Sequence, residues 1–84
     1  MLLAKSLAGH DKGKLYYVIS SDESFVCLVN GKTRTLGKPK KKKIKHVQLI
    51  KRLQRDLEIS DEDIKEDSDV RKLLKTYNRI MEEE

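Results

Sequence analysis

The residues best suited to do chemistry lie near the N-terminus, in the segment SLAGHDKGKLYYVI. In this segment Gly9 and Gly13 bracket His10, Asp11 and Lys12, directly before an apolar run. Residues of these types can form a phosphate-binding loop, a metal-binding loop, or a turn between two strands whose charged tip contacts a partner. The rest of the sequence must distinguish these possibilities.

The phosphate-binding loop fails on its mechanical requirements. Only three residues separate Gly9 from Gly13, and Leu15 stands where a Walker loop needs a hydroxyl for magnesium. The segment also leads into a predicted strand, whereas a Walker loop leads into a helix whose N-terminus faces the phosphate. The likeness to a Walker loop is therefore superficial.

Metal binding and catalysis are not indicated either. The candidate ligands share no metal-ligand spacing: His10, Asp11, Cys27 and His46. The sequence also shows no recognisable set of serine, histidine and acidic residue for nucleophilic catalysis. We therefore expect no cofactor, no metal and no enzymatic activity. Cys27 is the only cysteine, so no internal disulfide forms, and we expect its side chain to act as a small buried hydrophobe.

What remains is a turn between two strands, over about residues 5–8 and 15–19. Gly9 and Gly13 permit backbone conformations that other residues avoid, and the carboxylate of Asp11 can bond the amides of its own loop. The lysines of the turn would then project from a rigid support: Lys12 and Lys14.

The elements that follow are mostly short strands. Apolar and β-branched runs at 15–19 and 25–29 predict two of them, with a polar turn between. The dipeptide Asn30-Gly31 predicts a tight hairpin turn, with an antiparallel return strand over 33–36. Gly37 and Pro39 then end that strand, and the following lysines form a loop. Residues 46–57 fit a strand or a helix, and we favour a strand to about Leu49 followed by a helical turn.

The C-terminal part reads as helix. Ser60, ahead of three acidic residues, is a predicted N-cap, and Ser68 with Asp69 repeats that signal. Apolar residues then recur at helical spacing: Val70, Leu73, Leu74, Tyr77, Ile80 and Met81. We expect this stripe to pack on the sheet or on another chain. Arg71, Lys72, Lys75 and Arg79 lie off it.

Charge is divided sharply along the 84 residues, whose net charge is +5. Residues 1–55 contain 14 Lys or Arg and 3 Asp or Glu, whereas residues 56–84 contain 5 and 11. The densest basic stretch is Lys38–Lys45, which is either a solvated loop or localisation signal, or a contact for nucleic acid. Its place between two apolar runs favours nucleic acid. No apolar run approaches the roughly 20 residues that span a bilayer, so we expect a cytoplasmic protein with no membrane contact.

At this point the sequence resembles a known family. AGHDKGKLYYVI is similar to the KOW motif of ribosomal proteins and of NusG-type elongation factors. FVCLVNGKTRTLGKPKKKKIKHVQLI is similar to its continuation in small bacterial KOW-domain RNA-binding proteins, which themselves resemble a large-subunit ribosomal protein of archaea and eukaryotes. The resemblance covers about residues 3–50. It implies a small SH3-like β-barrel that binds structured RNA, with ribosomal RNA and ribosomal proteins as the expected partners.

The expected fold is therefore mainly β with a C-terminal α part: a barrel of about five strands over residues 1–50 and an acidic helical extension over 51–84. The expected RNA-binding residues are His10, Lys12, Lys14, Lys32, Arg34, Lys38, Lys40, Lys41, Lys42, Lys43, Lys45 and His46. Gly9, Asp11 and Gly13 support the loop. Tyr16 and Tyr17 alternate along a strand, so one should face the core and the other outward, and backbone recognition is favoured over sequence readout.

An alternative function is a protein–protein adaptor of the transcription or translation machinery, built from the barrel and an amphipathic helix. A helix whose apolar stripe lacks cover within the chain would favour this alternative. The sequence does not indicate an oligomeric state.

Overall fold

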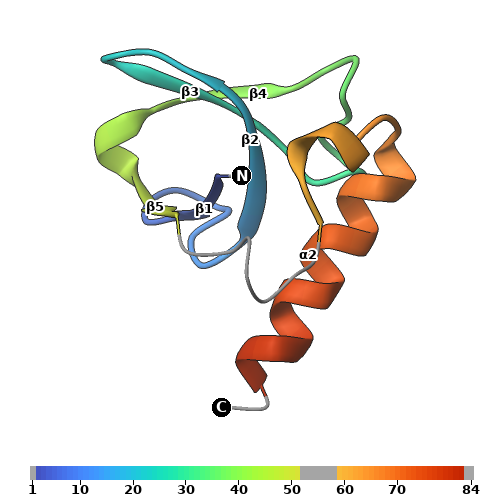
Figure 1. Ribbon diagram of the computed structural model, residues 1–84. Coiled ribbons are helices and arrows are strands. Elements are labelled where there is room, and N and C mark those ends of the chain that lie inside the picture. The colour runs from blue at the N-terminus through green and yellow to red at the C-terminus, as the bar shows by residue number, and fades with distance from the viewer. Residues whose placement is uncertain (1, 52–58, 83–84) are drawn as a thin grey trace.

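The structure, a computed structural model, describes residues 2–51 and 59–82. Five strands form one antiparallel sheet in the order β4-β3-β2-β1-β5. The strands are β1 (Leu3–Ser6), β2 (Leu15–Ser21), β3 (Phe25–Val29), β4 (Lys40–Lys43) and β5 (Val47–Ile50). Within the described residues, the helical elements are two 3₁₀ turns, Ile44–His46 and Asp61–Asp63, and the helix α2 (Asp67–Glu82). The predicted class, a small barrel-like β domain followed by helix, is confirmed (Figure 1).

The sheet curls because its two edge strands are joined by very little chain. The turn Ile44–His46 links β4 directly to β5, and the amide of Ile44 donates to the carbonyl of Ser24 at 2.8 Å. Strand β1 lies between β2 and β5, with Leu3 opposite Tyr17 on one side and opposite Ile50 on the other. Figure 1 shows the resulting curved sheet, with α2 lying beside β2.

One predicted strand is wrong. Residues 33–36 do not pair with β3, and the partner of β3 is β4, which lies in the lysine segment predicted as a loop. Asn30 causes the difference, because its Oδ1 accepts hydrogen bonds from the amides of Lys32 at 2.9 Å and Arg34 at 3.0 Å. These bonds close a compact loop in place of a two-residue hairpin. The predicted first strand is also displaced, to Leu3–Ser6.

Alternation of side chains gives the sheet two buried faces. The concave face encloses Ala4, Tyr16, Val18, Val26, Leu28 and Val47. The convex face contributes Leu3, Tyr17 and Val29, which pack against Val70, Leu73 and Leu74 of α2. Both tyrosines are therefore buried, and the expectation that one would face outward fails because α2 covers the second face. Cys27, expected to be buried, is half-buried.

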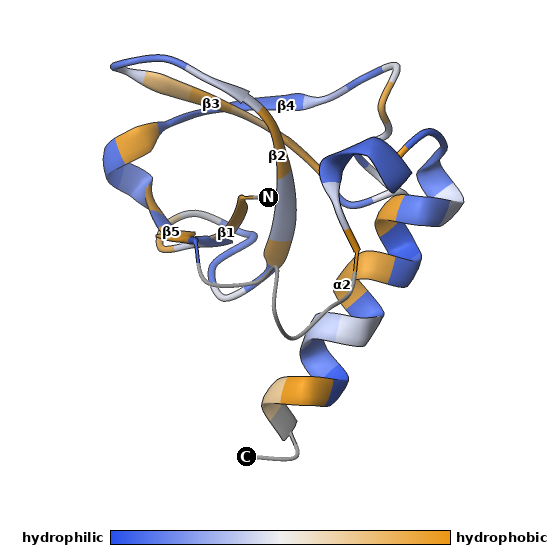
Figure 2. Cartoon of the chain, in the orientation of Figure 1, coloured by the Kyte–Doolittle hydropathy of each residue, from blue (hydrophilic) through white to orange (hydrophobic). Residues whose placement is uncertain are grey.

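Helix α2 packs in accordance with its sequence pattern, but it begins at Asp67, so the predicted cap signal of Ser68 and Asp69 lies inside its first turn. Its apolar residues alternate with hydrophilic ones along the helix (Figure 2), and Val70 and Leu73 are fully buried against the sheet. Near its start, Asp69 Oδ2 accepts from the amides of Lys65 and Glu66 at 3.1 and 2.9 Å. Ser60 is the N-cap of only the short 3₁₀ turn, where its backbone amide donates a hydrogen bond to Asp63 Oδ2 at 2.9 Å. The predicted strand before residue 50 is confirmed, while the helical turn expected after it lies largely outside the described residues.

Candidate functional site

The loop over residues 7–14 joins β1 to β2 and has the backbone that its glycines predict. Gly9 and Gly13 have φ of +84° and +87°, in the left-handed region that favours glycine. The amide of Gly13 donates to the carbonyl of Ser6 at 2.8 Å, and that of Lys14 donates to the carbonyl of Asp11 at 2.9 Å. Three side chains of this loop with predicted roles are exposed: His10, Lys12 and Lys14.

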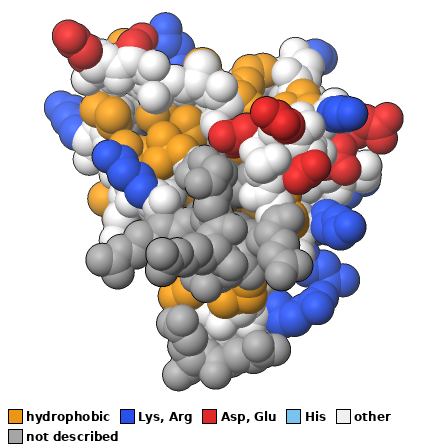
Figure 3. Space-filling model, viewed as in Figure 1, with side chains coloured by type: hydrophobic (Ala, Val, Ile, Leu, Met, Phe, Trp, Pro, Cys, Tyr) orange, Lys and Arg blue, Asp and Glu red, His pale blue; other side chains and the backbone are white. Residues whose placement is uncertain are grey.

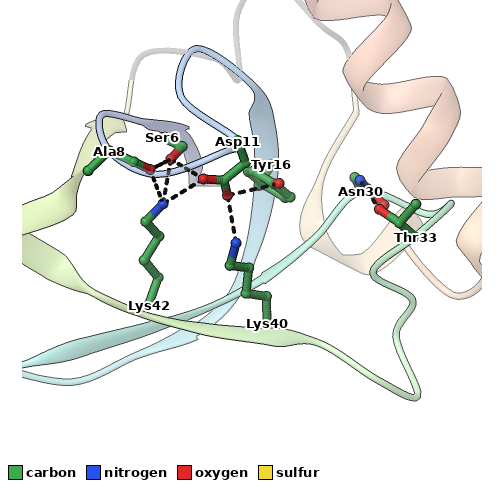
Figure 4. Close-up of polar contacts among 8 residues, drawn as sticks. All are labelled: Ser6, Ala8, Asp11, Tyr16, Asn30, Thr33, Lys40 and Lys42. Atoms are coloured by element: carbon green, nitrogen blue, oxygen red, sulfur yellow. Dashed lines mark hydrogen bonds and ion pairs between the residues drawn. The ribbon is translucent and has the colours of Figure 1, made fainter.

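Asp11 lies at the same loop but points into the barrel. Its carboxylate was expected to bond the amides of its own loop, and instead it contacts β1, β2 and β4 (Figure 4). Oδ1 accepts from Lys42 Nζ at 2.8 Å and from Ser6 Oγ at 2.9 Å, while Oδ2 accepts from Lys40 Nζ at 2.9 Å and Tyr16 Oη at 3.1 Å. The residue is only 7% exposed. Asp11 is thus the centre of a cluster that joins four segments of the chain.

The cluster changes the acid–base behaviour of its members. Burial alone raises the pKa of Asp11, but hydrogen bonds from Lys42, Lys40, Ser6 and Tyr16 outweigh it and hold the pKa well below its usual range. Burial and the bond to Asp11 raise the pKa of Tyr16 to about 12. At neutral pH the cluster therefore contains an ionised carboxylate and a neutral phenol.

Strand β4 divides the lysine run into two sets. Lys40 and Lys42 lie opposite Leu28 and Val26 on the concave face, and their side chains are 28% and 11% exposed. Lys42 Nζ also donates to the carbonyl of Ala8 at 2.8 Å and to Ser6 Oγ. The structure thus places the ammonium groups of both inward lysines on protein acceptors.

The other two lysines of β4 face solvent. Lys41 and Lys43 lie opposite Cys27 and Phe25 on the convex face, beyond the part that α2 covers. Lys41 Nζ sits 4.6 Å from the centroid of the Phe25 ring, a cation–π contact that sequence reasoning did not anticipate. Only the cross-strand register could have predicted this pair. The outward lysines therefore form a cationic surface, and the ring of Phe25 lies beneath one of them, Lys41.

The loop over residues 30–38 is anchored on α2. The amide of Leu36 donates to Asp67 Oδ1 at 2.8 Å, and Arg71 Nη1 donates to the carbonyl of Gly31 at 2.6 Å. The predicted contact residues of this loop are all exposed: Lys32, Arg34 and Lys38. Sequence reasoning assigned no role here to Asp67 or Arg71, which lie 31 and 40 positions after their partners Leu36 and Gly31.

Loop 7–14 and β4 are brought together, because Lys42 and Lys40 reach from one to the other. The segment after β4 also contacts this loop, since the amide of Leu7 donates to the carbonyl of His46 at 2.8 Å. Lys45 is exposed, and the side chain of His46 is half-buried. We define the barrel cation set as the exposed lysines of the two connected elements: Lys12, Lys14, Lys41 and Lys43.

Within residues 2–51 and 59–82, no group of three His, Cys, Asp or Glu side chains could hold a metal ion, and no helix is long and apolar enough to cross a membrane. Comparison with protein-family models and with curated proteins finds no match for this chain.

Proposed function

We propose that this protein is a non-enzymatic RNA-binding module of the KOW type, which binds the RNA backbone through the barrel cation set and the basic loop over residues 30–38. The resemblance of residues 3–50 to small bacterial KOW proteins supports ribosomal RNA as the ligand and a cytoplasmic, ribosome-associated location. The mechanism is electrostatic, because lysines that neutralise phosphates release the counterions held by RNA.

One observation carries the proposal: Asp11 ties loop 7–14 to β4. Its carboxylate is bonded to Lys40 and Lys42, so the exposed lysines of both elements are held on one frame. A binding surface that is ordered in advance loses less conformational entropy when its ligand arrives. Lysines on two flexible loops that are not joined to each other would lose more conformational entropy on binding.

The same cluster also concentrates positive charge on the outside. Residues 1–51 contain only three acidic residues, and Asp11, the one that lies in the loop, is turned inward. The other two, Asp22 and Glu23, lie in the turn between β2 and β3. The exposed part of loop 7–14 thus presents cations with no acidic side chain among them.

Base stacking has few candidates on this barrel. Tyr16 and Tyr17 are buried, and the ring of Phe25 has Lys41 over it. Recognition by shape and backbone, with little sequence preference, is the mode that these surfaces support. The adaptor alternative relied on an uncovered helix, whereas Val70, Leu73 and Leu74 of α2 are buried against the sheet.

The test is RNA binding by a variant that lacks the barrel cation set. Lys12→Ala, Lys14→Ala, Lys41→Ala and Lys43→Ala together should weaken binding of a fluorescently labelled RNA stem–loop in anisotropy titrations. If each lysine neutralises one phosphate, the slope of log K against log salt should become shallower by roughly 3. The same four positions changed to Arg keep the charge and should keep the slope.

An Ala variant that melts like the parent and retains the parent's affinity and slope would contradict the proposal. Ribosome association is measured separately. The protein should sediment with the large subunit when a cell lysate is run through a sucrose gradient. Its presence only in the slowly sedimenting fractions of free proteins would exclude ribosome association.

A further inference from the structure

The face of α2 that points away from the sheet is basic. Between residues 70 and 81 the helix contains four cations and no acidic residue. All four side chains are exposed: Arg71, Lys72, Lys75 and Arg79. Figure 3 shows Lys and Arg side chains along the lower right edge of the molecule, where Figure 1 places this helix. Residues 56–84 contain more acidic than basic residues, so their net charge alone does not predict this basic surface.

Apart from Glu82 at the last position of α2, the acidic residues in the described C-terminal part lie before the basic face, in the segment 61–69. Several of them have local tasks there. Asp67 accepts the amide of Leu36, Asp69 accepts the amides of Lys65 and Glu66, and Asp63 accepts the amide of Ser60. The C-terminal part is thus acidic at the start of α2 and basic along it.

The cations of this face have little compensation within the described part of the chain: Arg71 donates to the carbonyl of Gly31, and Lys72 lies near enough to the Asp69 carboxylate to add to the backbone hydrogen bonds that lower its pKa. Among the side chains that the structure describes, none forms an ion pair or hydrogen bond with the side chains of Lys72, Lys75 and Arg79. Arg71, Lys75 and Arg79 follow one another at intervals of four, and like charges at that spacing destabilise an isolated helix. The helix dipole favours cations only in the last turn, so it accounts for Arg79 alone.

We propose that Lys72, Lys75 and Arg79, here called the helix cation set, form a second phosphate-contact surface for the same RNA. The inference rests on the proposed function and extends it to the C-terminal helix. At 1.5 Å per residue, Lys75 and Arg79 are separated by about 6 Å along the axis, so each can reach a different phosphate. Bound phosphates would relieve the repulsion within the set.

The contacts of Arg71 make this surface continuous with the barrel. Its Nη1 donates to the carbonyl of Gly31, at the start of the loop that carries Lys32 and Arg34. An RNA strand that follows this loop therefore meets the first turns of α2. Arg71 acts as a positioning residue for the two surfaces and is not included in the helix cation set.

The test compares two variants that lose the same charge. Lys72→Gln, Lys75→Gln and Arg79→Gln together remove the helix cation set with residues that favour helix. The matched control carries Lys5→Gln, Lys51→Gln and Lys65→Gln, three exposed lysines outside both surfaces. With the labelled stem–loop, the helix variant should bind about tenfold or more weakly at 0.1 M salt, with a slope shallower by roughly 2. The control should change the slope by less than roughly 0.7, the value for one phosphate contact.

A second measurement is independent of substitution. Acylation of lysine amines, read by mass spectrometry on the unaltered protein, should show Lys72 and Lys75 protected by RNA and Lys65 unprotected. Equal labelling of Lys72 and Lys75 with and without RNA overturns the inference.

The outcomes also separate this inference from the proposed function. If only the variant of the barrel cation set loses RNA, the proposed function stands and the helix surface is refuted. If only the helix variant loses RNA, binding by α2 stands and the barrel interface is refuted. If neither variant loses RNA, both proposals fail.

Discussion

Gly31 and Asp67 are in contact so close that no side chain fits between them. A Cβ added to Gly31 would lie 2.5 Å from the carbonyl oxygen of Asp67 and 2.8 Å from Cγ of Arg71. Gly31 also has φ of +78°. The loop that carries Lys32 and Arg34 is therefore seated directly on the first turn of α2.

Gly31→Ala should destabilise the protein strongly. A positive φ costs an L-residue about 1–2 kcal/mol, and forced overpacking adds about 1–3 kcal/mol. We expect the free energy of unfolding, measured with urea, to fall by about 2–5 kcal/mol. Gly37→Ala is the matched control, because nothing lies within 4 Å of its added Cβ and its φ is ordinary. It should change stability by less than about 1 kcal/mol, and equal losses in both variants would show that the contact with α2 is dispensable.

Lys42 and Lys43 are neighbours on β4 with opposite surroundings, and the same substitution should distinguish them. Lys42→Met removes hydrogen bonds to Asp11, Ser6 and Ala8 and should cost at least about 2 kcal/mol of unfolding free energy. Lys43→Met changes an exposed side chain and should stay within about 0.5 kcal/mol of the parent. Thermal melting of both variants measures this contrast, and a melting temperature for Lys42→Met like that of Lys43→Met would mean that the inward bonds contribute nothing.

Because of Asp11, the free energy of unfolding should depend on pH in the acidic range. Its pKa lies below the usual value in the folded protein, so the folded state stays ionised after the unfolded chain begins to bind protons near pH 3.9. The stabilisation from its carboxylate is thus present above that pH and is lost as the pH falls further. Urea unfolding at a series of pH values should show the gap between the parent and Asp11→Asn narrowing below about pH 4. A gap that stays constant down to pH 2 would contradict this assignment.

The tyrosines should resist ionisation in alkali. The pKa of Tyr16 is raised to about 12, and burial together with the 2.7 Å bond to Asp61 raises that of Tyr17 above its usual range. Neutral phenols therefore stabilise the fold below about pH 10, and this stabilisation is lost as the pH rises further. Ultraviolet absorbance of tyrosinate should show late ionisation that becomes ordinary in denaturant. In Asp11→Asn the Tyr16 transition should move to lower pH, because its acceptor is no longer charged.

The strands with apolar alternation could be predicted from sequence, and the register of the lysines could not. β2, β3 and β5 are found where their β-branched residues predict them, since burial on a sheet selects those side chains. β4 consists only of lysine, so its pattern contains no difference between an inward and an outward position. What distinguishes Lys40 and Lys42 is Asp11, which is distant in the sequence and adjacent only in the fold.

For the same reason, only part of the candidate site could be predicted from the sequence. The positive φ of Gly9 and Gly13 follows from local chemistry and is confirmed. The direction of Asp11 depends on cations from another strand, and the burial of Tyr17 depends on α2, so local reasoning missed both. Contacts of RNA with the exposed lysines remain predictions.

The position of β1 between β2 and β5 determines when the chain can complete its fold. β1 is synthesised before its second neighbour in the sheet, β5, which is complete only when residue 50 has been added. Leu3 then still needs Val70 and Leu73 to cover it. Contacts this distant in sequence slow folding, because the ends of a long loop must meet before any contact is gained. An incomplete chain therefore exposes the apolar side of β1 and β2, and the protein should reach its native core only after α2 has been synthesised.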